Sequence, residues 1–298
     1  MPTSYSDSPI IILGMHRSGT SMITTFLKKM GLFVGEDVFD EIHNESKYFL
    51  QVNEELLKRV NASWDSVENF YYFLRNNELN EMALSRMAYD LQNTKKVGLK
   101  NAKIKDYLGR HSSLTSIKSP WGWKDPRTVI TAPLWLKLFP NAKIVYIVRN
   151  GVDVASSLQT RAIKDFKRKK EKYDKKFNSR SSSRSKLESS SYRGSARCLF
   201  LEGAFSLWEE YMESAEKTIS NMSNDKIVIK YEDLLQSPET YLRELAVFCD
   251  ISDEKISDIA SGVKSDRGSA YLNNPELKEF YQQAKDSQWM KLYGYSTC

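Results

Sequence analysis

The chain has 298 residues, of which 41% are hydrophobic, and we expect it to form a single domain over residues 1–298. No apolar run approaches the roughly 18 residues that a membrane span needs, and the first residues lack the basic start and apolar core of an export signal, so the sequence predicts a cytoplasmic protein. The three cysteines and three histidines have no metal-ligand spacing, which argues against a metal site.

The net charge of +6 comes from one segment. Residues 160–197 hold 14 Lys and Arg against 4 Asp and Glu, whereas the rest of the chain holds 30 against 34. The segment also has nine serines, and its apolar periodicity ends after Phe177. We therefore interpret it as a basic, serine-rich insertion whose second half is mobile.

Strand-like and helix-like patterns alternate along the chain. Strands are predicted at residues 9–13, 121–124, 143–148 and 227–230. Helices are predicted at residues 18–30, 54–60, 79–91, 128–139, from 150 onward and at 196–219. The last helix has one apolar face, formed by Phe200, Leu207, Tyr211 and Ala215. This alternation predicts an α/β fold, in which a P-loop-type parallel sheet is flanked by helices on both faces.

The first strand runs into a glycine-bounded loop, in the stretch "IIILGMHRSGTSM" at residues 10–22. Gly14 and Gly19 have the spacing of the phosphate loop G-x-x-x-x-G-K-[ST], but Thr20 stands where the lysine belongs. Backbone N–H groups at such a turn and at the open end of the next helix favour an anion. The side chains that can donate to its oxygens are Arg17, Ser18, Thr20 and Ser21. The loop therefore predicts an oxyanion site, and the displaced cation indicates a donor with a different arrangement from ATP.

Several stretches resemble sulfotransferases that use 3′-phosphoadenosine 5′-phosphosulfate (PAPS). "GMHRSGTS" resembles the 5′-phosphosulfate loop of that family, and "RNGVDVASS" resembles its 3′-phosphate element, here Arg149 and Ser157. "WKDPRTVITAPLWLKLFPNAKIVYIVRNG" is similar to tyrosylprotein sulfotransferases and bacterial relatives, which implies an active-site lysine at Lys124. "IVIKYEDLLQSPETYLRELAVFCDI" resembles the strand before an adenine-contacting tyrosine, here Tyr231, and "LYGYS" resembles the ending of many members.

This resemblance implies a set of site residues. Those implied to bind PAPS are His16, Arg17, Ser18, Gly19, Thr20, Ser21, Arg149, Ser157 and Tyr231. Arg17 and Lys124 are implied to neutralise charge in the transition state, and no metal is needed for that.

The residues alone leave simpler interpretations open. Arg149 could pair with Asp153, and Lys124 could pair with Asp125, because such ion pairs are common. Tyr231 could be a core tyrosine with one buried face.

Transfer to a hydroxyl group also requires a general base. Related bacterial members carry a glutamate just after "GYF", but the corresponding "SKYFLQ" has Leu50 there. Tyrosylprotein sulfotransferases have "GEE" after the first helix, and "GED" at residues 35–37 makes Asp37 the first candidate, Glu36 the second and His43 the third. A solvated acidic loop is an equally open interpretation of these residues.

The sequence thus predicts a sulfotransferase that moves a sulfuryl group from PAPS to a hydroxyl acceptor, either a saccharide, acidic ones included, or another small or lipid-linked alcohol. It identifies neither the acceptor nor the oligomeric state. The open alternatives are a P-loop small-molecule kinase and a polyanion-binding protein that uses the basic insertion; we expect no nucleic-acid partner. The insertion is also interpreted as a loop that attracts an acidic acceptor and closes over it.

Overall fold

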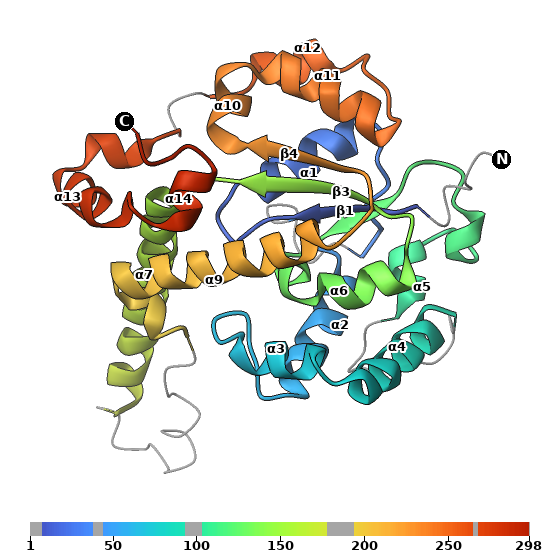
Figure 1. The fold of residues 1–298 in the computed structure, drawn as a ribbon, viewed down its shortest axis with the longest axis horizontal. Helices are drawn as coiled ribbons and strands as arrows, with labels where there is room; N and C mark the ends of the chain where they lie inside the picture. The colour runs from blue at the N-terminus through green and yellow to red at the C-terminus, as the bar shows by residue number, and fades with distance from the viewer. Residues whose placement is uncertain (1–7, 38–43, 93–102, 178–193, 265–267, 298) are drawn as a thin grey trace. The chain divides into compact units, whose positions relative to one another are not determined.

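The computed structural model describes residues 8–37, 44–92, 103–177, 194–264 and 268–297. Its sheet has four parallel strands in the order β2-β1-β3-β4 (Figure 1). These strands are β1 (Ile10–Leu13), β2 (Gly122–Lys124), β3 (Lys143–Val148) and β4 (Lys226–Lys230). Ile12 lies opposite both Lys124 and Val145, so the strands end together at one edge of the sheet. Ligands of parallel α/β sheets bind at this carboxyl edge.

Contacts among the described residues divide the chain into two compact units, Met1–Arg149 with Glu210–Ser269, and Asn150–Glu209 with Ala270–Cys298. The sheet belongs to the first unit. The helices that lie wholly in this unit are α1 (Thr20–Lys29), α2 (Lys47–Lys58), α3 (Glu68–Leu74), α4 (Asn77–Gln92), α5 (Ile104–Leu108), η2 (Leu114–Ser116), α6 (Thr128–Leu138), α10 (Tyr231–Gln236), α11 (Pro238–Cys249) and α12 (Ile256–Ser261).

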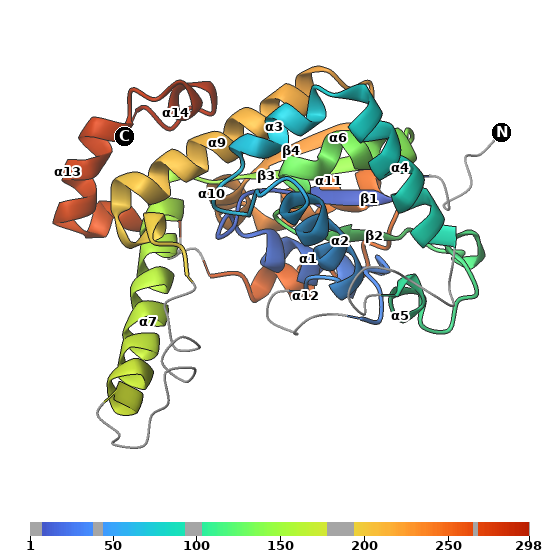
Figure 2. The ribbon, with the colours of Figure 1, turned by 90° about the horizontal axis from the view of Figure 1, so that it is seen from below.

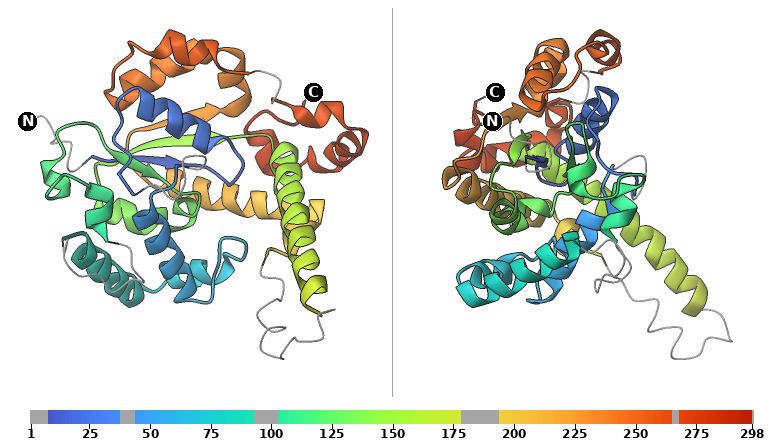
Figure 3. Two further views of the ribbon diagram at one scale, coloured as in Figure 1. Left: turned by 180° about the vertical axis from the view of Figure 1, so that it is seen from behind. Right: turned by 90° about the vertical axis from the view of Figure 1, so that its right-hand side faces the viewer.

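Both faces of the sheet are covered. Figure 1 shows α1 and α11 over one face and α6 over the other, and Figure 3 shows the same layers from behind. Alternate strand residues explain this, since successive side chains point to opposite faces. On one face a single apolar cluster includes Ile10, Ile12, Ile23, Leu27, Val145, Ile147, Leu245 and Cys249. On the other face, Tyr146 of β3 donates its hydroxyl to Sδ of Met212 in α9 (Leu201–Ser220). The predicted α/β fold is confirmed.

The second unit consists of α7 (Gly151–Phe177), η3 (Arg197–Leu199), the first part of α9, η5 (Ala270–Asn273), α13 (Pro275–Ala284) and α14 (Gln288–Leu292). Within it, the carboxylate of Asp153 accepts the backbone N–H groups of Ala270 and Tyr271, and Tyr271 stacks on Tyr281 at 4.9 Å. In Figure 2 the second half of α7 runs away from α13 and α14. The boundary at 209–210 falls inside α9, and this shared helix is our reason to propose that both units belong to one domain.

Several predicted bounds need correction. The helix predicted at 54–60 begins earlier, at Lys47, because Ser46 caps its first turn, and α3 and α5 were not predicted. The helix predicted at 196–219 is interrupted at Phe200, which adopts an extended conformation between η3 and α9 and is 65% exposed. Leu207, Tyr211 and Ala215 are buried, as their spacing predicted.

The basic insertion at 160–197 begins as helix. Residues 160–177 continue α7, so its first half is ordered structure rather than a loop. Residues 178–193, which hold most of the half predicted to be mobile, lie outside the described residues.

Candidate active site

The phosphate loop joins β1 to α1 at the carboxyl edge of the sheet. Gly19 is the N-cap of α1, with φ 92°, and no side chain caps the helix there. A Cβ at Gly19 would lie 2.3 Å from Cδ2 of Tyr231, so only glycine fits. No side chain therefore caps the first N–H groups of α1, and such a helix end suits an anion.

The side chains of the loop divide between core and solvent. Ser18 and Thr20 are buried, Ser21 is half-buried, and Arg17 is exposed. Arg17 has φ 71°, a strained conformation for a residue other than glycine, and such strain concentrates at functional sites. His16 is buried and meets the ring of Trp64 edge-on, with centroids 5.0 Å apart.

Two other predicted donor-binding residues meet the loop. Arg149 follows β3, and its NH1 donates to the backbone carbonyl of Arg17 at 3.1 Å. The Arg149 guanidinium also lies 4.5 Å from the ring centroid of Tyr231, the first residue of α10. The ends of β1, β3 and β4 thus bring Arg17, Gly19, Arg149 and Tyr231 together. Ser157 is a half-buried residue of α7 in the second unit.

Lys124 ends β2 and lies on the opposite side of β1 from β3. It is only 1% exposed, and its ammonium donates to Oε1 of Glu45 at 3.1 Å and to Oγ of Ser21 at 3.2 Å. A buried ammonium needs such a partner, because desolvation of an isolated charge is costly. Lys124 therefore connects a carboxylate to the first turn of α1.

Glu45 was not among the candidates from the sequence, and contacts on both sides fix its position. Before it, Asn44 donates to Oγ1 of Thr25 in α1 at 2.7 Å. After it, the backbone N–H of Tyr48 donates to Oδ2 of Asp37 at 2.7 Å. These contacts join segments 19 and 11 residues apart, so no local sequence signal reveals them.

Asp37, the first candidate for the base, supports the start of α2. Its backbone carbonyl also accepts the N–H of Lys47, and its Oδ1 is buried with no hydrogen-bond partner among the described residues. Burial raises the pKa of Asp37 above its usual value, although the N–H of Tyr48 opposes that rise. Glu36 is exposed, and His43 lies outside the described residues.

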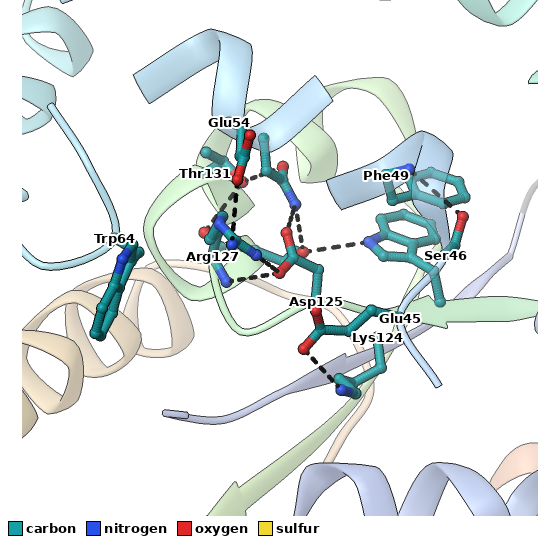
Figure 4. A network of polar contacts seen from close by, with 12 residues as sticks. Glu45, Ser46, Phe49, Glu54, Trp64, Lys124, Asp125, Arg127 and Thr131 are labelled. Carbon is teal, nitrogen blue, oxygen red and sulfur yellow. Dashed lines mark hydrogen bonds and ion pairs between the residues drawn. The ribbon is translucent and has the colours of Figure 1, made fainter. Parts of the chain in front are cut away.

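A buried polar network supports the end of β2 (Figure 4). Asn53 of α2 donates to Oδ2 of Asp125 at 2.8 Å, while Oδ1 of Asp125 accepts NH1 of Arg127 at 2.7 Å. The Asn53 carbonyl accepts Thr131 and Trp135, and NH2 of Arg127 reaches Glu54 at 3.3 Å. Asp125 is thus bound by Asn53 and Arg127, whereas Lys124 pairs with Glu45.

A model of the sulfotransferase family matches residues 9–255. This chain belongs to the sulfotransferase family. The sulfotransferase domain of the curacin biosynthetic pathway is 14% identical to it, with a TM-score of 0.49, and the match covers 94% of this chain and 98% of that one. A sulfotransferase from Alicyclobacillus acidocaldarius is 15% identical, with a TM-score of 0.48 and coverages of 98% and 97%. No curated protein matches this sulfotransferase.

The described residues also lack two features that would bear on the site. They contain no helix that is long and apolar enough to cross a membrane. Within the same residues, no group of three or more His, Cys, Asp or Glu side chains could hold a metal ion. The cytoplasmic location stays a prediction.

Proposed function

We propose that this sulfotransferase moves the sulfuryl group of PAPS to a hydroxyl group of a saccharide, or of another small or lipid-linked alcohol, and releases adenosine 3′,5′-bisphosphate. The observation that carries the proposal is the ion pair of Lys124 with Glu45 against Ser21. It brings a cation and a carboxylate to the helix end where an anion is favoured.

The residues at the phosphate loop suit such a donor. PAPS, when bound, supplies an activated sulfuryl group on a phosphate leaving group. The uncapped end of α1, the strained and exposed Arg17 and the hydroxyl of Ser21 all offer N–H or O–H donors to oxyanions. We propose that His16, Arg17, Ser18, Gly19, Thr20, Ser21, Arg149, Ser157 and Tyr231 hold it. The role of Ser157 rests on the sequence resemblance alone.

Lys124 and Glu45 divide the chemistry between them. A charged donor beside oxygens that gain negative charge stabilises the transition state more than the ground state, which is the role of Lys124 together with Arg17. The Glu45 carboxylate accepts the proton of the acceptor hydroxyl. We therefore propose Glu45 as the general base in place of Asp37, and Asp37 as a positioning residue that fixes the segment carrying Glu45.

The family match decides against the small-molecule kinase, in agreement with Thr20 at the position of the kinase lysine. Polyanion binding through the basic insertion stays a separate hypothesis.

The proposal is tested by the release of adenosine 3′,5′-bisphosphate from PAPS in the presence of neutral methyl glycosides, methyl glucuronide or p-cresol. We expect a saccharide to support turnover, and we expect Glu45→Gln to lower kcat by about 100-fold. Glu36→Gln, a change of an exposed glutamate nearby, is the matched control and keeps the wild-type rate. Wild-type turnover by Glu45→Gln would overturn the role of Glu45, and turnover with p-cresol alone would overturn the saccharide.

A further inference from the structure

The loop between α2 and α3 holds one tryptophan in a fixed position. Ser63 and Ser66 exchange backbone hydrogen bonds of 2.9 and 3.3 Å, which closes a tight turn around Trp64. Oγ of Ser63 donates to Asp65, and the hydroxyl of Tyr211 donates to the carbonyl of Trp64 at 2.8 Å. The turn is thus tied both to itself and to α9.

The Trp64 side chain is not a core residue. It is half-buried, whereas Trp121, Trp123 and Trp135 are fully buried. The indole and the ring of His16, in the phosphate loop, meet in a T-shaped arrangement, and the indole N–H has no hydrogen-bond partner among the described residues. An indole that is locked in place, partly open to solvent and adjacent to the active site offers a flat apolar face and a spare donor.

The proposed donor-binding residues lie on one side of the phosphate loop, and we call the other side, at β2, the acceptor side. Arg149 and Tyr231 follow β3 and β4, on one side of the phosphate loop, while Lys124 ends β2 and Arg127 follows it, on the other side. Figure 4 shows Trp64 across from Arg127, on the side away from Phe49. The pKa of Tyr211, which holds the turn, is raised by burial, and the charges of Arg127 and Asp65 also act on it, so these groups are neighbours.

The charges of this region decide the class of ligand. Burial lowers the pKa of Arg127, but Asp125 and Glu54 outweigh that effect and raise it, so both carboxylates already neutralise the guanidinium. Lys124 is paired with Glu45 in the same way, so both of these cations are already matched by carboxylates. Paired cations attract an anionic acceptor only weakly, whereas the paired groups can still hydrogen-bond to neutral hydroxyls.

We infer that Trp64 is the stacking platform of an acceptor subsite for an uncharged pyranose ring, with the Arg127–Glu54 pair hydrogen-bonding to its hydroxyl groups. The inference rests on the proposed function, because it names the acceptor of that reaction. A pyranose stacks its C–H face on indole and presents hydroxyls around its rim, which matches an apolar face bordered by polar groups.

The test is isothermal titration calorimetry of the full chain, saturated with adenosine 3′,5′-bisphosphate, against methyl glucoside, methyl galactoside and methyl mannoside. Methyl glucuronide and p-cresol are the comparison ligands. At least one neutral glycoside should bind saturably, and Trp64→Ala should weaken it about tenfold. Trp64→Phe should recover most of the affinity, and Tyr72→Ala, a change of an aromatic residue of α3 that is 61% exposed, should leave it unchanged.

Unchanged glycoside affinity in Trp64→Ala overturns the inference, as does saturable binding of only methyl glucuronide or p-cresol, or of no ligand in the panel. Binding of adenosine 3′,5′-bisphosphate should be the same in all variants, which shows that they are folded. If the wild-type protein does not bind that nucleotide, the proposed function fails, and the glycoside titration of the nucleotide-free protein still judges Trp64.

Discussion

At the scale of single residues, we propose that catalysis depends on the cations Lys124 and Arg17, which meet charge formed in the transition state. We expect Lys124→Ala and Arg17→Ala each to lower kcat by about 100-fold, since removal of one such donor from other enzymes has effects of that size. The affinity for adenosine 3′,5′-bisphosphate should change far less. Steady-state kinetics together with nucleotide titration measures both quantities.

The double variant Lys124→Met with Glu45→Gln is the control for folding and nucleotide affinity, because it removes the cation without leaving its carboxylate partner charged. If either single substitution altered only the Michaelis constant, the catalytic role of that residue would be wrong.

A second residue-scale prediction concerns Asp37 and pH. Because burial raises its pKa in the folded state above 3.8, the folded protein binds this proton more tightly than the unfolded chain does. The Asp37 contribution to the free energy of unfolding should therefore be most favourable below pH 3.8 and should fall as the pH rises through the folded-state pKa.

Asp37→Asn lacks this titration but keeps an oxygen for the N–H of Tyr48. Urea unfolding from acidic to neutral pH should thus show the variant gaining stability relative to the wild type as the pH rises. If the difference in the free energy of unfolding between the two proteins stayed constant from acidic to neutral pH, the pKa of Asp37 would not be raised by folding.

Single residues also show which parts of the candidate site could be predicted from the sequence. Arg17 and Lys124 could be predicted because their neighbours in the chain, the glycine loop and the "WKDP" stretch, identify them. Glu45 could not, because its position depends on contacts of Asn44 with Thr25 and of Asp37 with Tyr48. Our proposal of Glu45 in place of Asp37 as the base therefore rests on the structure and not on the sequence.

At the scale of elements, the start of α1 forms the proposed anion site. Gly19→Ala would force a side chain against Tyr231 at a φ of +92° and displace the helix end. We expect this variant to lose more than tenfold in affinity for adenosine 3′,5′-bisphosphate and about 1 to 2 kcal/mol in stability.

Gly31→Ala is its matched control, since Gly31 has φ +109° at the other end of α1 and nothing lies within 4 Å of a Cβ there. It should cost similar stability and leave nucleotide affinity unchanged. Equal nucleotide affinity in the two variants would contradict our assignment of the helix end.

Substitutions in α7 test the hypothesis that the basic insertion attracts an acidic acceptor and closes over it. Within residues 167–170, Arg168 and Lys169 pair with Asp165, and Lys170 pairs with Asp174. If the segment attracts an acidic acceptor, replacing these four residues with serine raises the Michaelis constant of an acidic saccharide at low salt and raises it less at high salt. The constant for a neutral glycoside stays the same. No change for the acidic saccharide at low salt would end the gating hypothesis.

The strands were easier to predict than the short helices. Residues 143–148 form β3 as expected, since a continuous apolar run between turn signals is typical of a buried parallel strand. The seven-residue α3 was missed because so short a helix has little periodicity, and packing of Phe70 and Phe73 stabilises it instead.

At the scale of the whole molecule, topology gathers a site from distant parts of the chain. The parallel strands end at one edge, where Lys124 ends β2 and Arg17, Arg149 and Tyr231 follow the three other strands. The alternation of strands and helices in the sequence predicted the parallel sheet. It could not predict the division into two compact units, because that division depends on contacts between residues far apart in the chain.

The most direct test of the central claim is thermal unfolding of the full chain with adenosine 3′,5′-bisphosphate, with adenosine 5′-monophosphate, or with ATP and magnesium. A ligand that binds only the folded protein stabilises it by RT ln(1 + [L]/Kd). We expect adenosine 3′,5′-bisphosphate without metal to give the largest rise in Tm, because Arg149 and the phosphate loop offer separate donors for its two phosphates. An equal rise with adenosine 5′-monophosphate, or a larger one with ATP and magnesium, would contradict the account.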